Sequence, residues 1–300
     1  MFKNLVGKKN LSMDRLATLC LVDEVGSIGK AARGDANRQS QFSRQIAELE
    51  SFLGIDLLDR SAKPYRITEK GAELARICRN YLSALDDFVG TCSGQPSKLI
   101  IGAGESLIHW LLIPAVLPVL KKAFPEARIS FRNMRTEAAI ESLQSGEIDI
   151  GFVRKDALTP VLSAAGKFVL DYRLYVPKKF RARLKSPVKF EEIAKLPLAV
   201  LEGRGQYRTT LENLAAEGGV ELKFVTECSS STQVALLVSR KECCAILPAY
   251  AESQFDRVGV QSYEVKGLRS LERTLCFAWN SKRAGVRPIL AKAAKVCATA

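Results

Sequence analysis

Residues 26–54 of this 300-residue chain read GSIGKAARGDANRQSQFSRQIAELESFLG, which predicts two short helices joined by a turn. Ser27 is suited to cap the first helix, and the small residues Ala31 and Ala32 let a neighbouring helix approach closely. The turn is expected over residues 34–37, whose composition is typical of turns. The second helix carries one apolar stripe, made of Phe42, Ile46, Leu49 and Leu53.

The polar side chains of the second helix are of the types that bind DNA. Arginine grips guanine with two hydrogen bonds, and asparagine or glutamine does the same to adenine. Serine hydroxyls and the N–H groups at a helix start suit phosphate oxygens. An ordinary amphipathic helix with a solvated polar face would show the same pattern. The residues in question are Asn37, Arg38, Gln39, Ser40, Gln41 and Arg44.

Residues 11–92 resemble the N-terminal module of LysR-type transcriptional regulators. The resemblance implies a winged helix-turn-helix that binds double-stranded DNA, and it adds Ser27 and Ser43 to the candidate DNA-binding residues. The chain departs from the family at Arg38-Gln39-Ser40-Gln41, where the family usually reads Ser-Gln-Pro/Ser-Ala, so we expect an unusual target sequence. The matched residues are Gly26-Ser27-Ile28, Ala31-Ala32, Ser43-Arg44-Gln45-Ile46, Leu49-Glu50, Leu53-Gly54, Leu57, Arg60, Thr68-Glu69 and Gly71.

Basic residues follow the second helix in a segment expected to form the wing. Arg60, Lys63 and Arg66 lie in or beside it, and Pro64 bends it. In winged helix-turn-helix proteins such a wing contacts phosphate or the minor groove. The same charge run also suits a solvated loop.

A long helix is expected over residues 68–92, with Thr68 as its cap. Its apolar residues recur at spacings 4-3-4-3, which is a heptad seam. A helix that exposes such a seam pairs with a second copy, so we predict a homodimer or homotetramer that sets several DNA-binding heads on one duplex. Packing of the seam inside its own monomer is the alternative. The seam residues are Leu74, Cys78, Tyr81, Leu85 and Phe88.

Composition narrows the class of protein but does not identify it. The formal net charge is +13, which favours a polyanionic partner. Residues 1–92 carry a net charge of only +2, however, and the remainder carries +11, so charge is weak support for DNA binding by the first part. Eight cysteines show no CxxC pair and no metal-ligand spacing, and no long apolar run or signal peptide is apparent. We therefore expect a cytoplasmic protein that needs no metal or cofactor and has no membrane partner.

After a linker over residues 91–98, strands and helices alternate, which predicts a parallel sheet. A second set of alternating elements predicts a second lobe. The expected domains are 1–92, with the helix 68–92, and 98–300, with lobe 1 over 98–158 and 266–300 and lobe 2 over 159–265. The expected strands are 98–103, 127–132, 148–153, 168–176, 198–201, 222–226, 244–247, 258–264 and 274–279.

This second region resembles the effector domain of LysR-type regulators, whose fold is similar to periplasmic solute-binding proteins. The resemblance is carried by Leu99-Ile100-Ile101-Gly102, Phe124-Pro125, Gly146–Ile150 and Ala245-Ile246-Leu247-Pro248. It implies a small-molecule effector. Some family members sense oxidants through a cysteine pair, but this chain has no cysteine over residues 202–217, where those members carry theirs.

Ligands of open parallel sheets bind beyond the carboxyl ends of the strands, between lobes. Ser106 and Thr232 each precede an expected helix, and three arginines at strand ends favour an anionic ligand. Glu105 opposes that preference, because the family commonly has a small residue or proline there. The candidate effector-binding residues are Gly104, Glu105, Ser106, Arg135, Thr136, Arg154, Gly203, Arg204 and Thr232.

Two functions from different classes fit these patterns. The first is a sequence-specific transcription regulator that switches when a small, anionic effector binds. The second is a cytosolic solute-binding or enzymatic α/β protein that its N-terminal module merely dimerises. The single histidine, His109, leaves no spare for a histidine-based catalytic pair, and no phosphate-binding P-loop is present, so we assign no catalytic residues.

Overall fold

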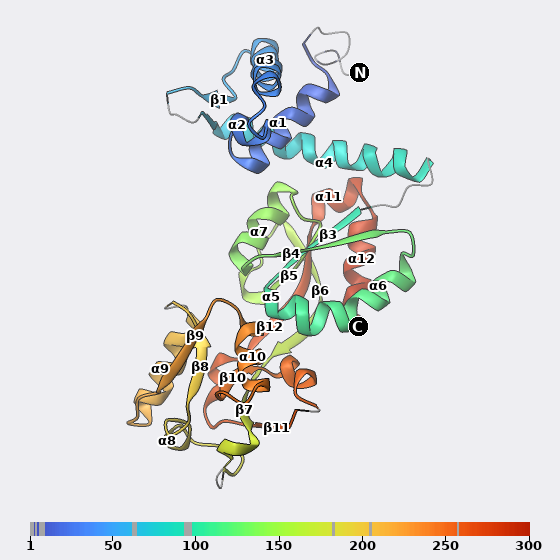
Figure 1. Cartoon of the computed structure of the whole chain (residues 1–300). Helices are drawn as coiled ribbons and strands as arrows, with labels where there is room; N and C mark the ends of the chain where they lie inside the picture. The colour runs from blue at the N-terminus through green and yellow to red at the C-terminus, as the bar shows by residue number, and fades with distance from the viewer. Residues whose placement is uncertain are drawn as a thin grey trace.

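Figure 1 shows three parts in chain order: a small helical module, the long helix α4 (Glu69–Cys92) beneath it, and a two-lobed α/β domain. The architecture matches the predicted fold class. The computed structural model describes residues 3, 5, 10–61, 65–92, 98–181, 184–203, 206–256 and 258–300.

The N-terminal module packs three helices and a two-stranded wing around one apolar core. Leu19, Ile46 and Leu49 are fully buried at its centre, and Leu57 closes it from the wing side. The stripe predicted for the second helix therefore faces the core, apart from Leu53 at its end. The elements are α1 (Met13–Val25), α2 (Ile28–Ala31), α3 (Ala36–Leu53), β1 (Leu58–Asp59) and β2 (Arg66–Ile67).

Local capping sets the boundaries of these helices. The Ser27 hydroxyl accepts a hydrogen bond from the Lys30 N–H at 3.3 Å, as predicted. The Asp35 carboxylate accepts from the N–H groups of Asn37 and Arg38, so α3 begins at Ala36, one residue inside the predicted turn. Gly54 ends α3 with φ of 70°, a left-handed conformation that favours glycine.

The first lobe is a five-stranded mixed sheet. β3 runs parallel to β4 and β5, as predicted, but β12 runs antiparallel to β5 and β6. The parallel arrangement predicted from the first three strands is therefore confirmed, and the sheet becomes mixed because the chain returns from the second lobe in the opposite direction. Across the sheet the order is β4 (Arg128–Asn133), β3 (Lys98–Ala103), β5 (Ile150–Arg154), β12 (Arg273–Asn280) and β6 (Leu162–Leu170).

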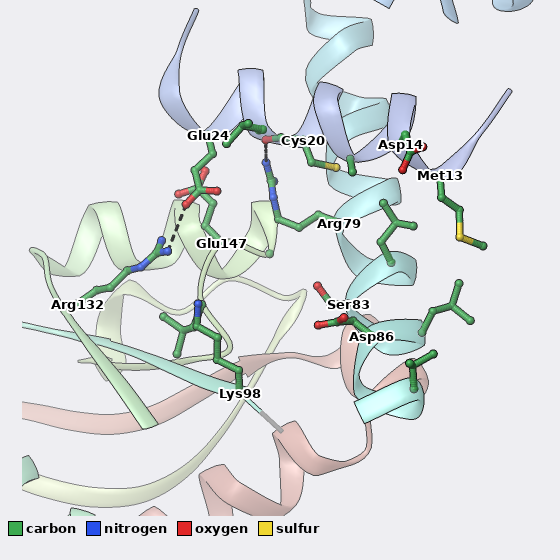
Figure 2. A pocket seen from close by; sticks show the side chains of 17 residues that line it. Met13, Asp14, Cys20, Glu24, Arg79, Ser83, Asp86, Lys98, Arg132 and Glu147 are labelled. Carbon is green, nitrogen blue, oxygen red and sulfur yellow. Dashed lines mark hydrogen bonds and ion pairs between the residues drawn. The ribbon is translucent and has the colours of Figure 1, made fainter. Parts of the chain in front are cut away.

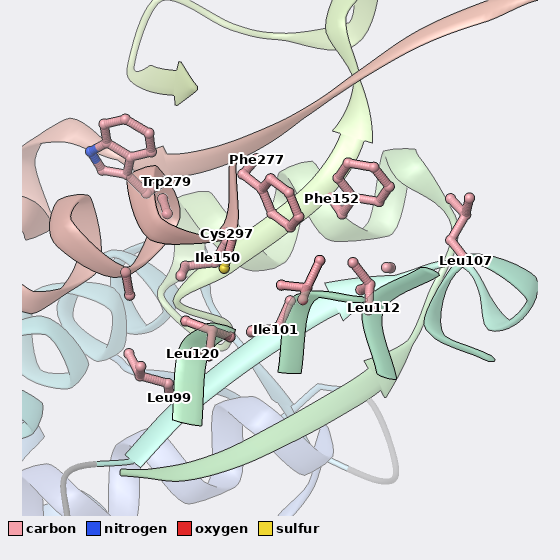
Figure 3. Packing of buried hydrophobic residues seen from close by; sticks show 14 of the residues in the cluster. Leu99, Ile101, Leu107, Leu112, Leu120, Ile150, Phe152, Phe277, Trp279 and Cys297 are labelled. Carbon is pink, nitrogen blue, oxygen red and sulfur yellow. The ribbon is translucent and has the colours of Figure 1, made fainter. Parts of the chain in front are cut away.

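Aromatic rings fill the core of this lobe. Phe152 and Phe277 stack with their centroids 4.5 Å apart, and Phe168 meets both edge-on. Leu112 and Leu120 of the helical segment join the same core, where Figure 3 shows them beside Ile101 and Leu99 of β3. This packing fixes the sheet whose carboxyl edge carries the candidate effector-binding residues.

A continuous helical segment over Glu105–Ala123 covers one face of the sheet. By length and composition alone it is apolar enough to cross a membrane, although charged and polar residues interrupt the run. The sequence predicts this helix only over residues 111–123, with a packed helix start next to His109; the helix begins six residues earlier, and His109 is exposed. Its buried residues lie in the core of the first lobe, as in the core helix of a globular domain. Its parts are α5 (Glu105–Leu107), the π-helical η1 (Ile108–Val116) and α6 (Leu117–Ala123).

The second lobe joins two small sheets. The first is antiparallel and the second parallel. A bridge between Leu198 and Cys244 connects the two sheets. The strands are β10 (Ala245–Pro248), β7 (Tyr172–Pro177) and β11 (Val260–Tyr263) in one sheet, and β8 (Leu198–Leu201) and β9 (Phe224–Cys228) in the other.

The boundary between the lobes differs from the predicted one. Residues 168–176, predicted as one strand, contribute to two strands in different sheets: β6 ends at Leu170, and β7 begins at Tyr172. Because β6 pairs with β12, the second lobe begins at about residue 171 rather than 159. Trp110 of η1 reaches across and packs with Tyr175 in the core of the second lobe.

The remaining helices cover the two lobes. α7 packs on β5, and α12 packs on the opposite face of the first sheet with α6, as Figure 1 shows. They are α7 (Thr136–Ser145), α8 (Phe190–Ile193), α9 (Gln206–Glu217), α10 (Ser231–Ser239), α11 (Ser281–Val286) and α12 (Ile289–Cys297), with short 3₁₀ turns η2 (Lys155–Ala157), η3 (Lys178–Phe180), η4 (Ala249–Gln254) and η5 (Leu268–Leu271).

Candidate DNA-binding surface and ligand cleft

Polar contacts with α1 fix the orientation of α3 as firmly as its buried stripe does. Arg15 of α1 forms an ion pair with Glu48 of α3 at 2.5 Å. The Thr18 hydroxyl donates to the Gln45 side-chain oxygen at 2.6 Å. These contacts lie on the inner flank of α3, so its opposite face points away from the module.

The opposite face carries the predicted DNA-binding residues of α3, and all of these are exposed. Ser27, also predicted to bind DNA, is buried and its hydroxyl caps α2. Within the described part of the chain, Arg38 lies over the ring of Phe42, with 5.7 Å from its guanidinium carbon to the ring centroid. The other side chains of this face show no hydrogen bond or ion pair within the same described ranges. The exposed set is Asn37, Arg38, Gln39, Ser40, Gln41, Ser43 and Arg44.

The wing residues divide into three cases. Arg60 is already paired, since its guanidinium donates to both carboxylate oxygens of Glu50, at 3.2 and 2.6 Å. This contact raises the pKa of Arg60, and about two-fifths of its side chain stays exposed. Arg66 is exposed on β2, and Lys63 lies outside the described residues. The Arg60–Glu50 pair therefore gives Arg60 a structural role that the sequence did not indicate.

The predicted seam on α4 splits into two halves. Leu74 and Cys78 pack toward α1 of the same chain, as the alternative interpretation required for this half. Tyr81, Leu85 and Phe88 are exposed by 59%, 48% and 68%. The second half therefore presents an apolar surface with no cover among the described residues.

Four of the predicted effector-binding residues line one cavity of about 430 Å³ between the lobes: Gly104, Arg135, Thr136 and Arg154. The Arg154 guanidinium donates to Glu137 at 3.0 Å and also lies 3.6 Å from Asp156. Arginines and apolar side chains together suit a ligand with an anionic group and an apolar body.

A smaller cavity of about 150 Å³ adjoins this one and contains Ser106. Next to it, Glu105 of the first lobe accepts a hydrogen bond from the Thr232 hydroxyl of the second lobe at 2.5 Å. Gly203 lies in an exposed turn and lines neither cavity, and Arg204 lies outside the described residues.

Sequence reasoning missed three polar residues of the cleft. Tyr172 and Tyr207 stack with their centroids 5.1 Å apart and line both cavities, and Arg273 lines the larger one. The Tyr207 hydroxyl donates to the Ile246 carbonyl at 2.5 Å. Burial raises the pKa of Tyr172 to about 12 and raises the pKa of Tyr207 well above its ordinary value, so both stay neutral hydrogen-bonding groups. Tyr172 and Arg273 lie next to the two chain segments that cross between the lobes. The sequence did not indicate this position, because it placed the boundary between the lobes at residue 159.

A third cavity, of about 630 Å³, lies where the N-terminal module and α4 meet the first lobe (Figure 2). Arg79 of α4 forms an ion pair with Asp23 of α1 at 2.8 Å and donates to the Ser145 carbonyl at 2.9 Å. Arg132 of β4 pairs with Glu24 of α1 at 3.2 Å, which Figure 2 shows beside Arg79. These contacts join the module and α4 to the end of α7 and to β4.

Three cysteines of the second lobe, Cys228, Cys243 and Cys244, are poorly suited to sensing oxidants. Cys243 and Cys244 are buried, and burial raises their pKa values to about 11 and about 12. Burial also raises the pKa of Cys228. The reactive thiolate is therefore scarce at neutral pH in each of these groups. No group of residues suited to hold a metal ion occurs within the described ranges.

Two family models match the chain and together span most of it. Residues 13–72 match the bacterial regulatory helix-turn-helix protein, lysR family, and residues 93–293 match the LysR substrate binding domain. Among curated relatives, the regulator BenM of Acinetobacter baylyi is 28% identical over 253 residues, covering 81% of this chain and 82% of the relative. A probable nitrogen assimilation transcriptional activator of Synechococcus elongatus is 26% identical over 252 residues, covering 80% of each.

Solved structures share the fold over nearly the whole chain. A full-length OxyR variant of Pseudomonas aeruginosa gives a TM-score of 0.67 at 18% identity, covering 97% of this chain and 96% of that one. CbnR, solved full-length with its target DNA, gives a TM-score of 0.59 at 18% identity, covering 96% of this chain and all of that one.

Proposed function

The chain belongs to the LysR family of transcriptional regulators, and from this premise we propose how its parts divide the work of DNA binding and effector control. The exposed polar face of α3 contacts the bases, with Arg44 near its centre. Arg66 and the remaining wing residues contact the phosphates. A small-molecule effector binds in the cleft and shifts the equilibrium between arrangements of the DNA-binding modules.

One observation supports the DNA-binding assignment most directly. The stripe of α3 is buried and its inner flank is tied to α1, while seven polar side chains on its outer face are exposed. Contact with base edges requires a helix whose orientation is fixed, as the contacts with α1 fix that of α3, whereas a helix face that only meets solvent does not require this. CbnR, which shares the fold, has been solved on its target DNA.

The second half of the α4 seam supplies the dimer contact in this proposal. Tyr81, Leu85 and Phe88 form an exposed apolar strip on one helix, which a second copy of α4 would cover. We propose domain boundaries at 1–92 for the DNA-binding module with α4 and 98–300 for the effector domain.

The cleft supports an effector with an anionic group. Arg135, Arg154 and Arg273 line the larger cavity beside the stacked rings of Tyr172 and Tyr207. The proposed role of the cleft is binding without catalysis, and the only histidine, His109, lines neither of its cavities.

A salt titration of DNA binding tests the proposal. DNA recovered from a random-sequence pool with the wild-type protein serves as the probe. Binding should weaken steeply with salt, because phosphate contacts release counterions. Arg44→Glu should weaken binding about 100-fold, since it removes a base contact of about 1–3 kcal/mol and adds repulsion from phosphate.

Lys195→Glu is the matched control, because it makes the same charge change on an exposed residue of the second lobe. It should leave binding within about twofold of wild type. Equal binding by Arg44→Glu and the control would overturn the assignment of α3. If the wild-type protein selected no specific DNA from the pool, the result would favour the alternative function: a solute-binding or enzymatic protein that its N-terminal module only dimerises.

A further inference from the structure

One contact crosses the cleft from lobe to lobe and does not fit a site that simply attracts anions. Glu105 stands in the first turn of α5, and Thr232 stands in the first turn of α10 in the opposite lobe. The Glu105 carboxylate accepts a hydrogen bond from the Thr232 hydroxyl at 2.5 Å, and both side chains are partly buried. Hydrogen bonds to a carboxylate are about twice as strong as those between neutral groups.

The surroundings hold this pair in place. The Thr232 oxygen lies 2.8 Å from the Ser230 hydroxyl, which in turn accepts from the Gln233 N–H and caps α10. Ser106 and Ser231, the neighbours of Glu105 and Thr232 in sequence, line the smaller cavity. The Ser106 and Ser231 hydroxyl groups could bind a ligand carboxylate in the smaller cavity, but the carboxylate of Glu105 already lies next to them.

Charge is thus divided along the cleft. Arg135, Arg154 and Arg273 line the larger cavity, whereas Glu105 lies beside the smaller one. A second carboxylate placed next to Glu105 would meet a like charge in a partly buried site, which disfavours its charged form. A ligand carboxylate is therefore steered to the arginine end.

We propose that Glu105 is a specificity-determining residue that acts as an internal carboxylate: it ties the two lobes through Thr232 and excludes a carboxylate ligand from the Ser106 end of the cleft. This inference rests on the proposed role of the cleft in effector binding. The effector then presents an uncharged or hydrogen-bond-donating group to Glu105 and its anionic group to the arginines.

Hydrogen exchange on the full-length protein, without any effector, tests both parts. Glu105→Gly removes the side chain, and exchange of the backbone amides over residues 231–236 should rise about tenfold as the tie between lobes is lost. Glu105→Gln retains an acceptor oxygen and should keep most of the protection. Thr232→Val removes the hydroxyl at nearly constant shape and should reproduce the effect of Glu105→Gly.

Acetate added at constant ionic strength tests the exclusion of carboxylates. It should restore protection over residues 231–236 in Glu105→Gly, because it can take the place of the missing carboxylate, and it should leave the wild type unchanged. Chloride at the same ionic strength should rescue neither protein.

If both Glu105→Gly and Thr232→Val exchanged at the wild-type rate, Glu105 and Thr232 would not hold the two lobes together. If acetate protected the wild type as much as it protected Glu105→Gly, Glu105 would not exclude carboxylate ligands. Failure of the proposed function looks different, since a chain that bound no specific DNA would still show this exchange pattern.

Discussion

The DNA-binding module and the first lobe each enclose one carboxylate, and they surround it differently. In the module, Glu50 accepts hydrogen bonds from the N–H groups of Leu57 and Leu58 and from Arg60, all within ten residues of it in the chain. In the first lobe, Asp149 accepts from the Ile100 N–H and from the guanidinium groups of two arginines more than 130 residues away, Arg283 and Arg287. The module is organised locally, whereas the lobe depends on the return of the chain end.

This difference matters for signalling because the long-range cluster lies below the junction with α4. Gly146 precedes β5 by a few residues, and an added Cβ there would lie 2.7 Å from the Asn80 side-chain oxygen of α4 and 3.3 Å from the Arg283 Nε. Arg79 contacts the neighbouring Ser145 carbonyl. This turn therefore places the first lobe in direct contact with α4.

The sharpest test of the comparison is Asp149→Ala. It leaves two buried guanidinium groups without their carboxylate, and burial already lowers the pKa of Arg283. Removing one partner of a buried ion pair costs about 3–5 kcal/mol. Denaturant unfolding followed by tryptophan fluorescence reports this domain alone, because Trp110 and Trp279 both lie in it.

Asp156→Ala is the control, because Asp156 is 71% exposed and its contact with Arg154 is a surface ion pair worth about 1 kcal/mol or less. The module, followed by hydrogen exchange of α3, should keep wild-type protection in Asp149→Ala. If α3 also lost its protection, the two parts would not be independently organised.

The same contrast explains which features the sequence could predict. The exposed polar face of α3, which we propose binds DNA, comes from one continuous stretch whose apolar period fixes the outward direction of its polar residues, so its exposure was predictable from the sequence. The cleft gathers residues from five or more elements of both lobes, and no local period specifies their meeting. Arg135 and Arg154 were predicted because strand ends meet at one edge of a sheet, and Ser106 because it also precedes a helix there.

Two errors have physical causes. Residues 168–176 form a mostly apolar run that only Asp171 and Arg173 interrupt, and sequence alone does not show that the chain changes sheets at Asp171. The structural role of Arg60 depends on its ion pair with Glu50, ten residues earlier. Glu50 is not part of the apolar stripe of α3, so the stripe does not predict this contact. Tyr207 was missed for a similar reason, because its position beside Tyr172 depends on tertiary packing and not on a local pattern.

A second test concerns α4, which belongs partly to the module and partly to the dimer contact. Leu85→Lys replaces an exposed seam residue and should weaken dimerisation by a factor of about 10 to 100, since a buried leucine contributes about 1.5–3 kcal/mol. Analytical ultracentrifugation over a concentration range measures the change. Leu236→Lys, also about half exposed but on α10, should leave the dimer unchanged. A wild-type association constant in Leu85→Lys would place the dimer contact elsewhere.

A third test uses pH to probe the carboxylate of the module. Burial alone would raise the pKa of Glu50, but the hydrogen bonds from Arg60, Leu57 and Leu58 outweigh it and hold this pKa below its ordinary value of 4.5. A carboxylate with a lowered pKa stabilises the fold above its unfolded-state pKa, and this contribution disappears as the pH falls through the lower, folded-state pKa. Glu50→Gln should therefore destabilise the module by about 1.5 kcal/mol at pH 7.

The difference between Glu50→Gln and wild type should shrink as the pH falls below 4.5, because the wild-type carboxyl then becomes protonated. Hydrogen exchange of α3 as a function of pH, corrected for the intrinsic exchange rate, measures this. A difference that stayed constant down to pH 3 would mean that the charge of Glu50 contributes nothing.

The smallest effect is expected at the cap of α2, where the module depends on a single local hydrogen bond. Ser27→Ala removes the acceptor of the Lys30 N–H and should cost about 1 kcal/mol of module stability. Ser12→Ala, at the cap of α1, is the matched comparison, since its hydroxyl accepts from Arg15 N–H at a similar 3.4 Å. Because α1 is thirteen residues long and α2 only four, the loss of a cap should disturb DNA binding more in Ser27→Ala, where the short helix positions the start of α3. Equal loss of operator affinity in the two variants would mean that α2 only fills space and does not orient α3.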